Sequence, residues 1–150
     1  MIDENRIQHM LGVARRCYAL AKDAGYSEKI CRNMWLMGLL HDVGYEFGEP
    51  KDHAKVGAEM FEGLQAYPDF WHICNAIKRH GVSEKQERYG NSLYLSILNE
   101  ADMTVDHKGL NCSYEERLSD IAQRYGKDSD PYRETQEFMK VLRKVYTKSA

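Results

Sequence analysis

The feature that most constrains the fold of this chain is the helical spacing of its apolar residues. Between Arg6 and Ala24 the apolar residues fall three or four positions apart, and Gly25 follows as a stop. The 150 residues include only three prolines, and no apolar–polar alternation is sustained between turn residues. The pattern therefore predicts an all-α fold of about seven helices. A chain of this length is large enough for one domain with a real core.

Capping residues divide the helical pattern into separate elements. Ser113 with Glu116 forms a capping box, and Asp130 followed by Pro131 suits the start of a last helix. The residues expected to cap helices are Ser27, Asp52, Asp69, Ser113 and Asp130. We expect helices over residues 6–24, 28–42, 52–64, 70–80 and 92–105, then two that begin at 113 and 130. The segments 43–51, 81–91 and 106–112 are expected to be loops, and the second helix, apolar nearly all round, to be buried.

The charge balance and the lack of targeting patterns narrow the functional classes. Lys and Arg number 21 and Asp and Glu number 23, which gives a formal net charge of −2 and argues against a basic coat for long nucleic acid. No apolar run approaches the ~20 residues of a membrane span. The first ten residues lack the pattern of a secretory signal. We therefore expect a cytoplasmic protein that binds neither a membrane nor long nucleic acid.

The four cysteines do not suggest a metal or disulfide framework. Cys17, Cys31, Cys74 and Cys112 form no CxxC pair and no zinc-ribbon spacing. In a chain without a secretory signal, this spacing favours four reduced thiols, some of them buried.

The adjacent pair His41-Asp42 is the strongest chemical signal. The two residues end the most apolar predicted helix, where neighbours point about 100° apart and cannot share one apolar face. An ionised carboxylate there is costly unless a charge or hydrogen-bond donors compensate it. Either a metal ion or backbone donors of the following loop could do so.

Four further residues favour the metal. His9, His53, His80 and Asp102 each lie at a helix end or at the edge of an apolar stripe. Taken singly, each could be a satisfied polar residue, but all four together are unlikely to be so by chance. Imidazole and carboxylate suit Fe, Mn, Ni and Zn. His9 lies beside the main stripe of its helix, in a position that suits a cleft.

Two other histidines serve as contrasts. His72 lies off the apolar stripe of the fourth predicted helix and is expected on the surface or in packing. His107 follows Asp106 in a predicted loop, where it could be a packing residue or could support the site from behind its ligands.

The ordered set of histidines and aspartates resembles the HD-domain superfamily. That pattern is a His, then an adjacent His-Asp, then a distant Asp, on helices of an all-α fold. The contexts MGLLHDVGY, DHAKVGAEM, AIKRHG and ILNEADM also match. The similarity covers about residues 6–106, and with helices over about 113–148 it implies a single domain over 1–150. Tyr45 stands where some HD families have Lys, which argues against the cyclic-dinucleotide phosphodiesterases.

The resemblance implies a centre for two divalent ions, drawn from Fe, Mn, Ni, Zn or Mg. His9, His41, Asp42 and Asp102 would surround one ion. His53 and His80 would bind the second, with Asp42 bridging. Ions about 3.5–4 Å apart lower the pKa of a bound water and neutralise phosphoryl oxygens.

The implied activity is phosphate-ester or anhydride hydrolysis by a metal-bound hydroxide, with His41 and Asp42 as catalytic residues. The nearest relatives would be bacterial phosphohydrolases of nucleotides or dinucleoside polyphosphates, which gives a small, nucleotide-type phosphorylated substrate. The basic residues next to the ligands could bind its phosphate or could be solvated surface charges; they are Arg16, Lys55, Lys78 and Arg79. The alternatives are a two-iron oxygenase of the same family and a non-catalytic nucleotide- or metal-sensing module. The oligomeric state stays open, with a homodimer as one possibility.

Overall fold

The computed structural model describes residues 2–64, 67–81 and 92–147, with only the backbone of 145–147. The described residues contain seven α-helices, three short 3-10 helices and no strand, apart from one isolated bridge between Val105 and Asn111. The all-α prediction is confirmed. The α-helices are α1 (Glu4–Asp23), α2 (Glu28–Leu40), α3 (His53–Glu59), α4 (Pro68–Arg79), α6 (Leu93–Met103), α7 (Tyr114–Tyr125) and α8 (Asp130–Thr147). The 3-10 helices are η1 (Val43–Glu46), η2 (Pro50–Asp52) and η3 (Glu62–Leu64).

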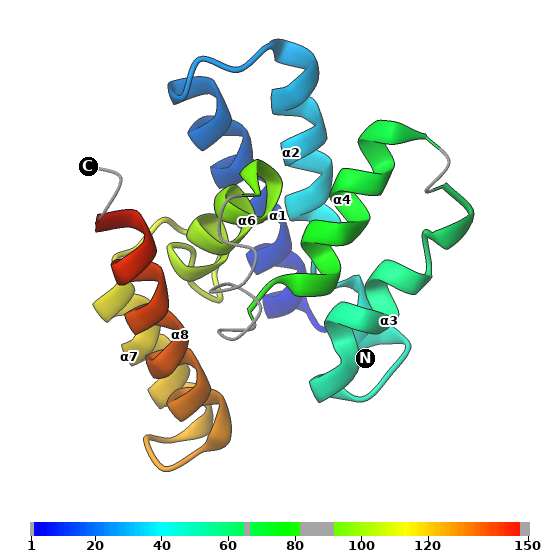
Figure 1. The fold of residues 1–150 in the computed structure, drawn as a ribbon. Coiled ribbons are helices and arrows are strands. Elements are labelled where there is room, and N and C mark those ends of the chain that lie inside the picture. Colours follow the sequence, from blue (N-terminus) through cyan, green and yellow to red (C-terminus); the bar gives the residue numbers. More distant parts are fainter. Residues whose placement is uncertain (1, 65–66, 82–91, 148–150) are drawn as a thin grey trace.

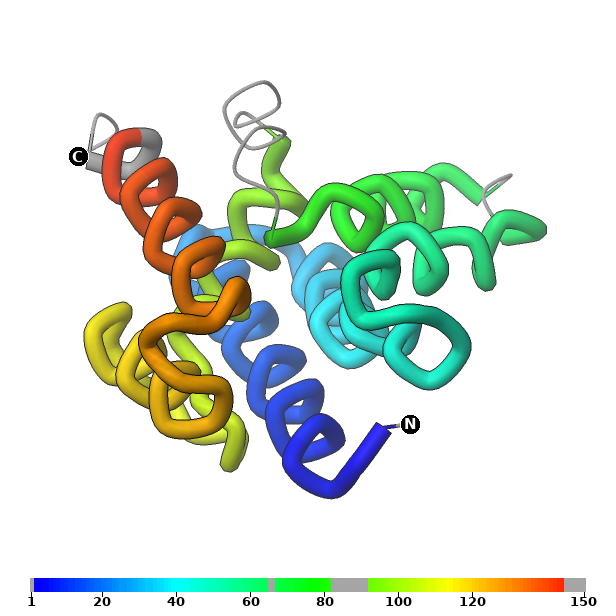
Figure 2. Tube along the Cα trace, turned by 90° about the horizontal axis from the view of Figure 1, so that it is seen from below, coloured from blue at the N-terminus to red at the C-terminus, as the bar shows by residue number. Residues whose placement is uncertain are grey.

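Helices α1 and α2 form a hairpin at the centre of the molecule. Gly25 closes α1 at a φ of 82°, which a residue with a Cβ rarely adopts. The Ser27 hydroxyl then accepts a hydrogen bond from the Ile30 amide and begins α2, as predicted. The two helices approach closely at Gly38, where a Cβ would lie 2.8 Å from Ala14 Cα. Figures 1 and 2 show α4 and α6 packed beside this hairpin.

The apolar core lies between α1, α2, α4 and α6. It is built from small and medium side chains that are almost completely buried, among them Val13, Cys17, Met34, Met37, Ile77 and Leu98. A smaller cluster joins Met103 to α8 through Phe138 and Leu142. The helical spacing of Phe138, Leu142 and Val145 predicts that all three face inward. Phe138 and Leu142 do so, whereas the side chain of Val145 lies outside the described residues. Helices α7 and α8 therefore form a hairpin docked at one end of the molecule (Figure 1).

Several predicted helix boundaries are wrong by one or two residues because a neighbouring residue satisfies the backbone better. Helix α4 is capped at Tyr67 and not at Asp69, because Pro68 occupies its first position. The Ser129 hydroxyl accepts from the Tyr132 amide at the start of α8, so Ser129 and not Asp130 supplies the cap. Asp52 makes no capping hydrogen bond to α3.

The expected loop over residues 43–51 contains η1 and begins η2, because local i→i+3 bonds tighten this segment into 3-10 turns. The predicted third helix, over 52–64, divides into α3 and η3. The predicted loop at 106–112 is confirmed, and the one at 81–91 lies outside the described residues beyond Gly81.

The prediction that the second helix is buried on all sides is also wrong. Met34 and Met37 of α2 are fully buried, but the Trp35 side of the helix faces outward. The reason is that α1, α4 and α6 cover only part of the circumference of α2. In the part of the chain that the structure describes, no helix has the length and apolar character needed to cross a membrane.

Candidate metal centre

The six predicted ligands come together from five elements. His9 lies in α1 and Asp102 in α6. His41 and Asp42 follow the last residue of α2, which ends at Leu40 and not near Asp42 as predicted. His53 is the first residue of α3, and His80 is the cap that follows α4. Placement at helix ends leaves these side chains free to turn toward one another. The His9 side chain is almost completely buried.

The four histidine rings are oriented by backbone carbonyl groups. In each ring Nδ1 donates a hydrogen bond to a carbonyl oxygen, which can only accept. The Nδ1 proton is therefore fixed and a lone pair remains on Nε2 of the neutral ring, as in metal-ligating histidines. The pairs are His9 with Asp106 at 3.1 Å, His41 with Gly38 at 2.7 Å, His53 with Pro50 at 2.7 Å and His80 with Ile77 at 2.5 Å.

The first half of the centre surrounds Asp102. His9 Nε2 lies 2.9 Å from Asp102 Oδ1, and His41 Nε2 lies 3.4 Å from the same oxygen. His41 Nε2 also lies 3.3 Å from Asp42 Oδ2. Two imidazole nitrogens and two carboxylates thus face one small volume.

The second half surrounds the other oxygen of Asp42. Asp42 Oδ1 lies 3.5 Å from His53 Nε2 and 3.4 Å from His80 Nε2. Because its two oxygens face different histidine groups, the Asp42 carboxylate has the geometry of a bridging ligand.

The groups around the two buried carboxylates hold them in their ionised form. Burial raises the pKa of the Asp42 and Asp102 carboxyl groups, but His41 and the neighbouring donors outweigh it and hold both well below the usual range. Burial lowers the pKa of His41, yet the two carboxylates raise it to about 10. The carboxylates are therefore ionised at neutral pH, which is the form that binds a metal ion.

His53 has the opposite shift, which suits a ligand. Burial and the neighbouring His80 lower the pKa of His53 to about 4. Its Nε2 lone pair is therefore available at neutral pH without loss of a proton.

A buried nitrogen that makes no hydrogen bond is a further sign of a metal site. His41 Nε2 is fully buried and forms no hydrogen bond with any residue in the described ranges. Such an atom is costly unless something binds it. The donor set is imidazole and carboxylate, which divalent transition ions accept. The buried groups His9–His41–Asp102 and His41–Asp42–His80 could each hold a metal ion.

A glycine fixes the position of His53 relative to Asp42. A Cβ on Gly44 would lie 1.8 Å from the His53 carbonyl oxygen, so only glycine permits η1 to meet the start of α3. Gly44 lies two positions after Asp42, so this close contact sets the position of His53 relative to the His41-Asp42 pair.

Sequence reasoning missed Arg6. Its Nη1 donates to Asp42 Oδ2 at 2.8 Å, and its guanidinium lies 3.9 Å from the centre of the Tyr45 ring. The Tyr45 ring also stacks on His53, with ring centroids 4.1 Å apart. Arg6 and His9 are three positions apart and share a face of α1, and this spacing is the sequence signal that could have identified Arg6.

The basic residues predicted to bind substrate lie on three helices, α1, α3 and α4. Arg16 donates from Nε to the Thr104 hydroxyl at 3.4 Å, two residues after Asp102. Lys55 is exposed and pairs loosely with Glu59 at 3.9 Å. Lys78 is exposed at the end of α4, and Arg79 beside it is half-buried. That these four residues bind the substrate stays a prediction.

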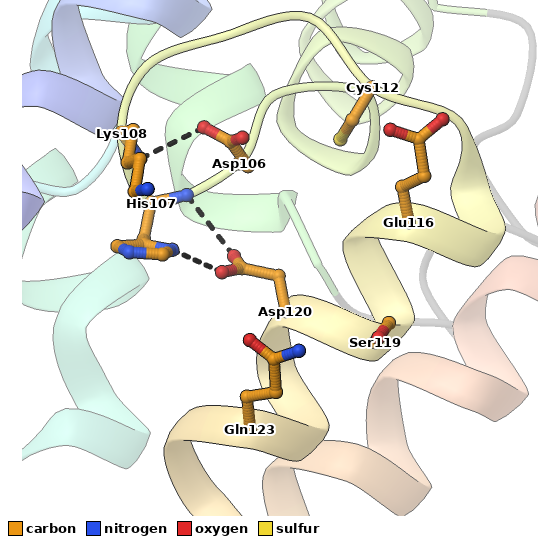
Figure 3. A pocket seen from close by; sticks show the side chains of 8 residues that line it. All are labelled: Asp106, His107, Lys108, Cys112, Glu116, Ser119, Asp120 and Gln123. Carbon is orange, nitrogen blue, oxygen red and sulfur yellow. Dashed lines mark hydrogen bonds and ion pairs between the residues drawn. The ribbon is translucent and has the colours of Figure 1, made fainter.

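The contacts of His72 and His107 within the described residues are with Tyr94, Trp71 and Asp120, not with one of the six ligands. His72 is exposed and stacks on Tyr94, as expected of a packing residue. His107 does not support a ligand directly; its backbone amide and its ring both donate to Asp120 of α7 (Figure 3). Asp120 in turn binds Arg117, a second buried residue that sequence reasoning missed. Arg117 and the buried Ile121 are four positions apart, which is the signal that could have placed Arg117 on the inner face of α7.

A family model described as HD domain matches residues 6–111, which is more than two thirds of the chain. The chain belongs to the HD-domain family. HD-domain proteins are mostly metal-dependent hydrolases, in agreement with the buried His and Asp groups described above. No curated protein and no solved structure shows a significant match to the chain. In this HD domain, the matched region ends before α7 and α8.

Proposed function

We propose that this HD-domain protein is a phosphohydrolase that uses two divalent ions and acts on a small, nucleotide-type phosphate ester or anhydride. The observation that carries the proposal is the convergence of four histidine Nε2 atoms on the carboxylates of Asp42 and Asp102. An isolated His–Asp pair occurs in many proteins for structural reasons. Four oriented histidines around two buried carboxylates have no comparable structural explanation.

The proposed division of ligands follows the two halves of the centre. His9, His41, Asp42 and Asp102 would hold one ion. His53 and His80 would hold the other, with Asp42 contributing to both. When bound, such a pair lowers the pKa of a water toward neutrality and neutralises phosphoryl oxygens.

The remaining residues act by orientation. Arg6 fixes Oδ2 of Asp42 and compensates part of its charge. Burial lowers the pKa of the guanidinium, but the Asp42 carboxylate outweighs this effect and raises the pKa, so Arg6 stays protonated. Burial raises the pKa of the Tyr45 phenol, so this group stays protonated at neutral pH and can donate a hydrogen bond. The carbonyl groups behind the four histidines hold the rings in place.

The test combines metal analysis with a substrate screen. Protein purified without chelator is analysed for Fe, Mn, Ni, Zn and Mg, and then assayed for phosphate release from nucleotides and dinucleoside polyphosphates with each ion. Phosphate release without O₂ that is lost on chelation supports the proposal. Turnover that requires O₂ and a mixed-valent iron pair would instead identify an oxygenase. Binding of nucleotide by fully metallated protein without turnover would identify a sensing module.

A further inference from the structure

Arg117 is a buried cation at the edge of the metal centre. It comes from α7, beyond the residues that match the family model, and only 7% of it is exposed. Its Nη2 lies 4.0 Å from Asp102 Oδ1, the oxygen that His9 and His41 also face. The positive charge is close enough to lower the pKa of His9, after the larger effect of burial.

The guanidinium is held from the side of α7. Its Nη1 donates to Asp120 Oδ2 at 2.9 Å. Asp120 is itself fixed by the amide of His107, at 3.1 Å, and by the His107 ring (Figure 3). Asp120 is therefore the principal ion-pair partner of Arg117, and Asp102 is left at a distance longer than a direct hydrogen bond.

Part of the hydrogen-bonding capacity of Arg117 is unused. Its Nε is fully buried and has no hydrogen-bond partner among the residues that the structure describes. A buried charged donor without a partner costs more than a neutral one, and it commonly marks a place where a ligand, ion or water binds. A planar guanidinium, fixed by a carboxylate behind it, suits two oxygens of a phosphate.

We propose that Arg117 holds a phosphoryl oxygen of the substrate at the metal centre, with Asp120 and His107 fixing its position. The inference rests on the proposed function and adds to it one residue from the C-terminal hairpin. It also explains how the site could bind an anion, since Lys55 and Lys78 are exposed side chains on other elements. The competing explanation is that Arg117 is a structural ion pair that links α7 to the rest of the fold.

Phosphate binding by the metal-loaded protein separates these explanations. The full chain is loaded with Mn²⁺, and the dissociation constant of inorganic phosphate is measured by calorimetry for wild type, Arg117→Gln and Arg117→Lys. The matched control is Arg124→Met, on the same helix, whose guanidinium lies over Tyr125. We expect Arg117→Gln to weaken phosphate binding at least about tenfold, as for loss of a charged hydrogen bond. Arg117→Lys should give an intermediate loss, and Arg124→Met a change below about twofold.

Mn²⁺ content measured on the same samples makes each result decisive. The proposal requires Arg117→Gln to keep the Mn²⁺ of the wild type. Loss of Mn²⁺ would mean that Arg117 positions Asp102, and unchanged phosphate affinity would mean a structural ion pair; either result overturns the proposal. If Arg117→Gln does not fold, Arg117→Lys decides, because it keeps the charge and loses the planar fork. A wild-type protein that holds Mn²⁺ but does not bind phosphate would instead contradict the proposed function, and with it the proposed role of Arg117.

Discussion

The Nε2 atoms of His53 and His80 lie 3.1 Å from each other. Each ring donates its Nδ1 proton to a backbone carbonyl, so in the neutral rings two lone pairs face one another. Two acceptors at this distance repel unless a cation lies near both. Asp42 Oδ1 is within 3.5 Å of each nitrogen. These two nitrogens and this oxygen are therefore the ligand atoms that we propose for the second ion.

We predict that His53→Ala and His80→Ala each lose one of two bound ions and keep the other. His9, His41, Asp42 and Asp102 still surround the first ion in both variants. Elemental analysis should show a fall from two ions to one per chain, and kcat/KM for phosphate release should fall by at least about 100-fold. His72→Ala is the matched control, since His72 is exposed and stacks on Tyr94. Full activity with a single ion would show that the two histidines bind substrate or only pack.

Asp42→Ala is expected to abolish metal binding in both halves of the centre. One oxygen of Asp42 faces His41 and the other faces His53 and His80, and no neighbouring carboxylate can replace both. The measurement is the metal content of the variant after dialysis against the ion that the wild-type protein binds. A variant that retained two ions per chain would disprove the bridging role.

Gly44→Ala should separate His53 from the rest of the centre. The new methyl group would collide with the His53 carbonyl, so α3 has to move away from η1. We expect a loss of about 1–3 kcal/mol in the free energy of unfolding, as for overpacking, together with weaker binding of one ion. Denaturant unfolding and metal titration measure the two effects. Gly63→Ala is the control, because a Cβ at Gly63 meets no atom within 4 Å, and equal effects of the two variants would refute the explanation.

Replacing the basic residues one at a time should change kcat/KM by different amounts. Lys55→Ala and Lys78→Ala are expected to change kcat/KM by less than about twofold, because surface charges in water contribute little. Arg6→Ala should lower kcat/KM by more than about tenfold, because it removes a charged hydrogen bond of 2.8 Å to Asp42. Steady-state kinetics on the best phosphate ester provide the comparison. If Lys55→Ala or Lys78→Ala lowered kcat/KM more than Arg6→Ala, phosphate would bind beside that lysine and not beside Arg6.

Thiol labelling should be slow and strongly dependent on pH. Cys17, Cys31 and Cys74 are buried, and Cys112 is half-buried. Burial raises the pKa of Cys112 to about 11, so only about 0.1% of it is thiolate at pH 8. The fastest phase with a disulfide reagent should rise about tenfold per pH unit between pH 8 and 10 and disappear in Cys112→Ser. A fast phase that persists in Cys112→Ser would contradict the assigned burial.

The sequence alone was sufficient for the all-α class, for most of the helices and for the set of candidate ligands. Helical periodicity and local caps such as Ser27 depend on residues only a few positions apart, so they can be read directly. The predicted ligands His9 and Asp102 were found because their residue types are awkward at their positions, and the structure places them 2.9 Å apart. The boundaries that failed, at Asp69 and Asp130, depended on competition between adjacent capping residues.

Only the tertiary structure determines which residues on other helices contact the ligands. The division of the Asp42 carboxylate between two histidine groups, and the contact of Arg6 with Asp42, join residues up to 38 positions apart through the packing of separate helices. The approach of Arg117 to Asp102 depends on how the α7–α8 hairpin docks, and no local pattern specifies that docking. Residue types and spacing are local properties of a sequence, whereas distances between side chains on different helices are set by the packing of the whole core.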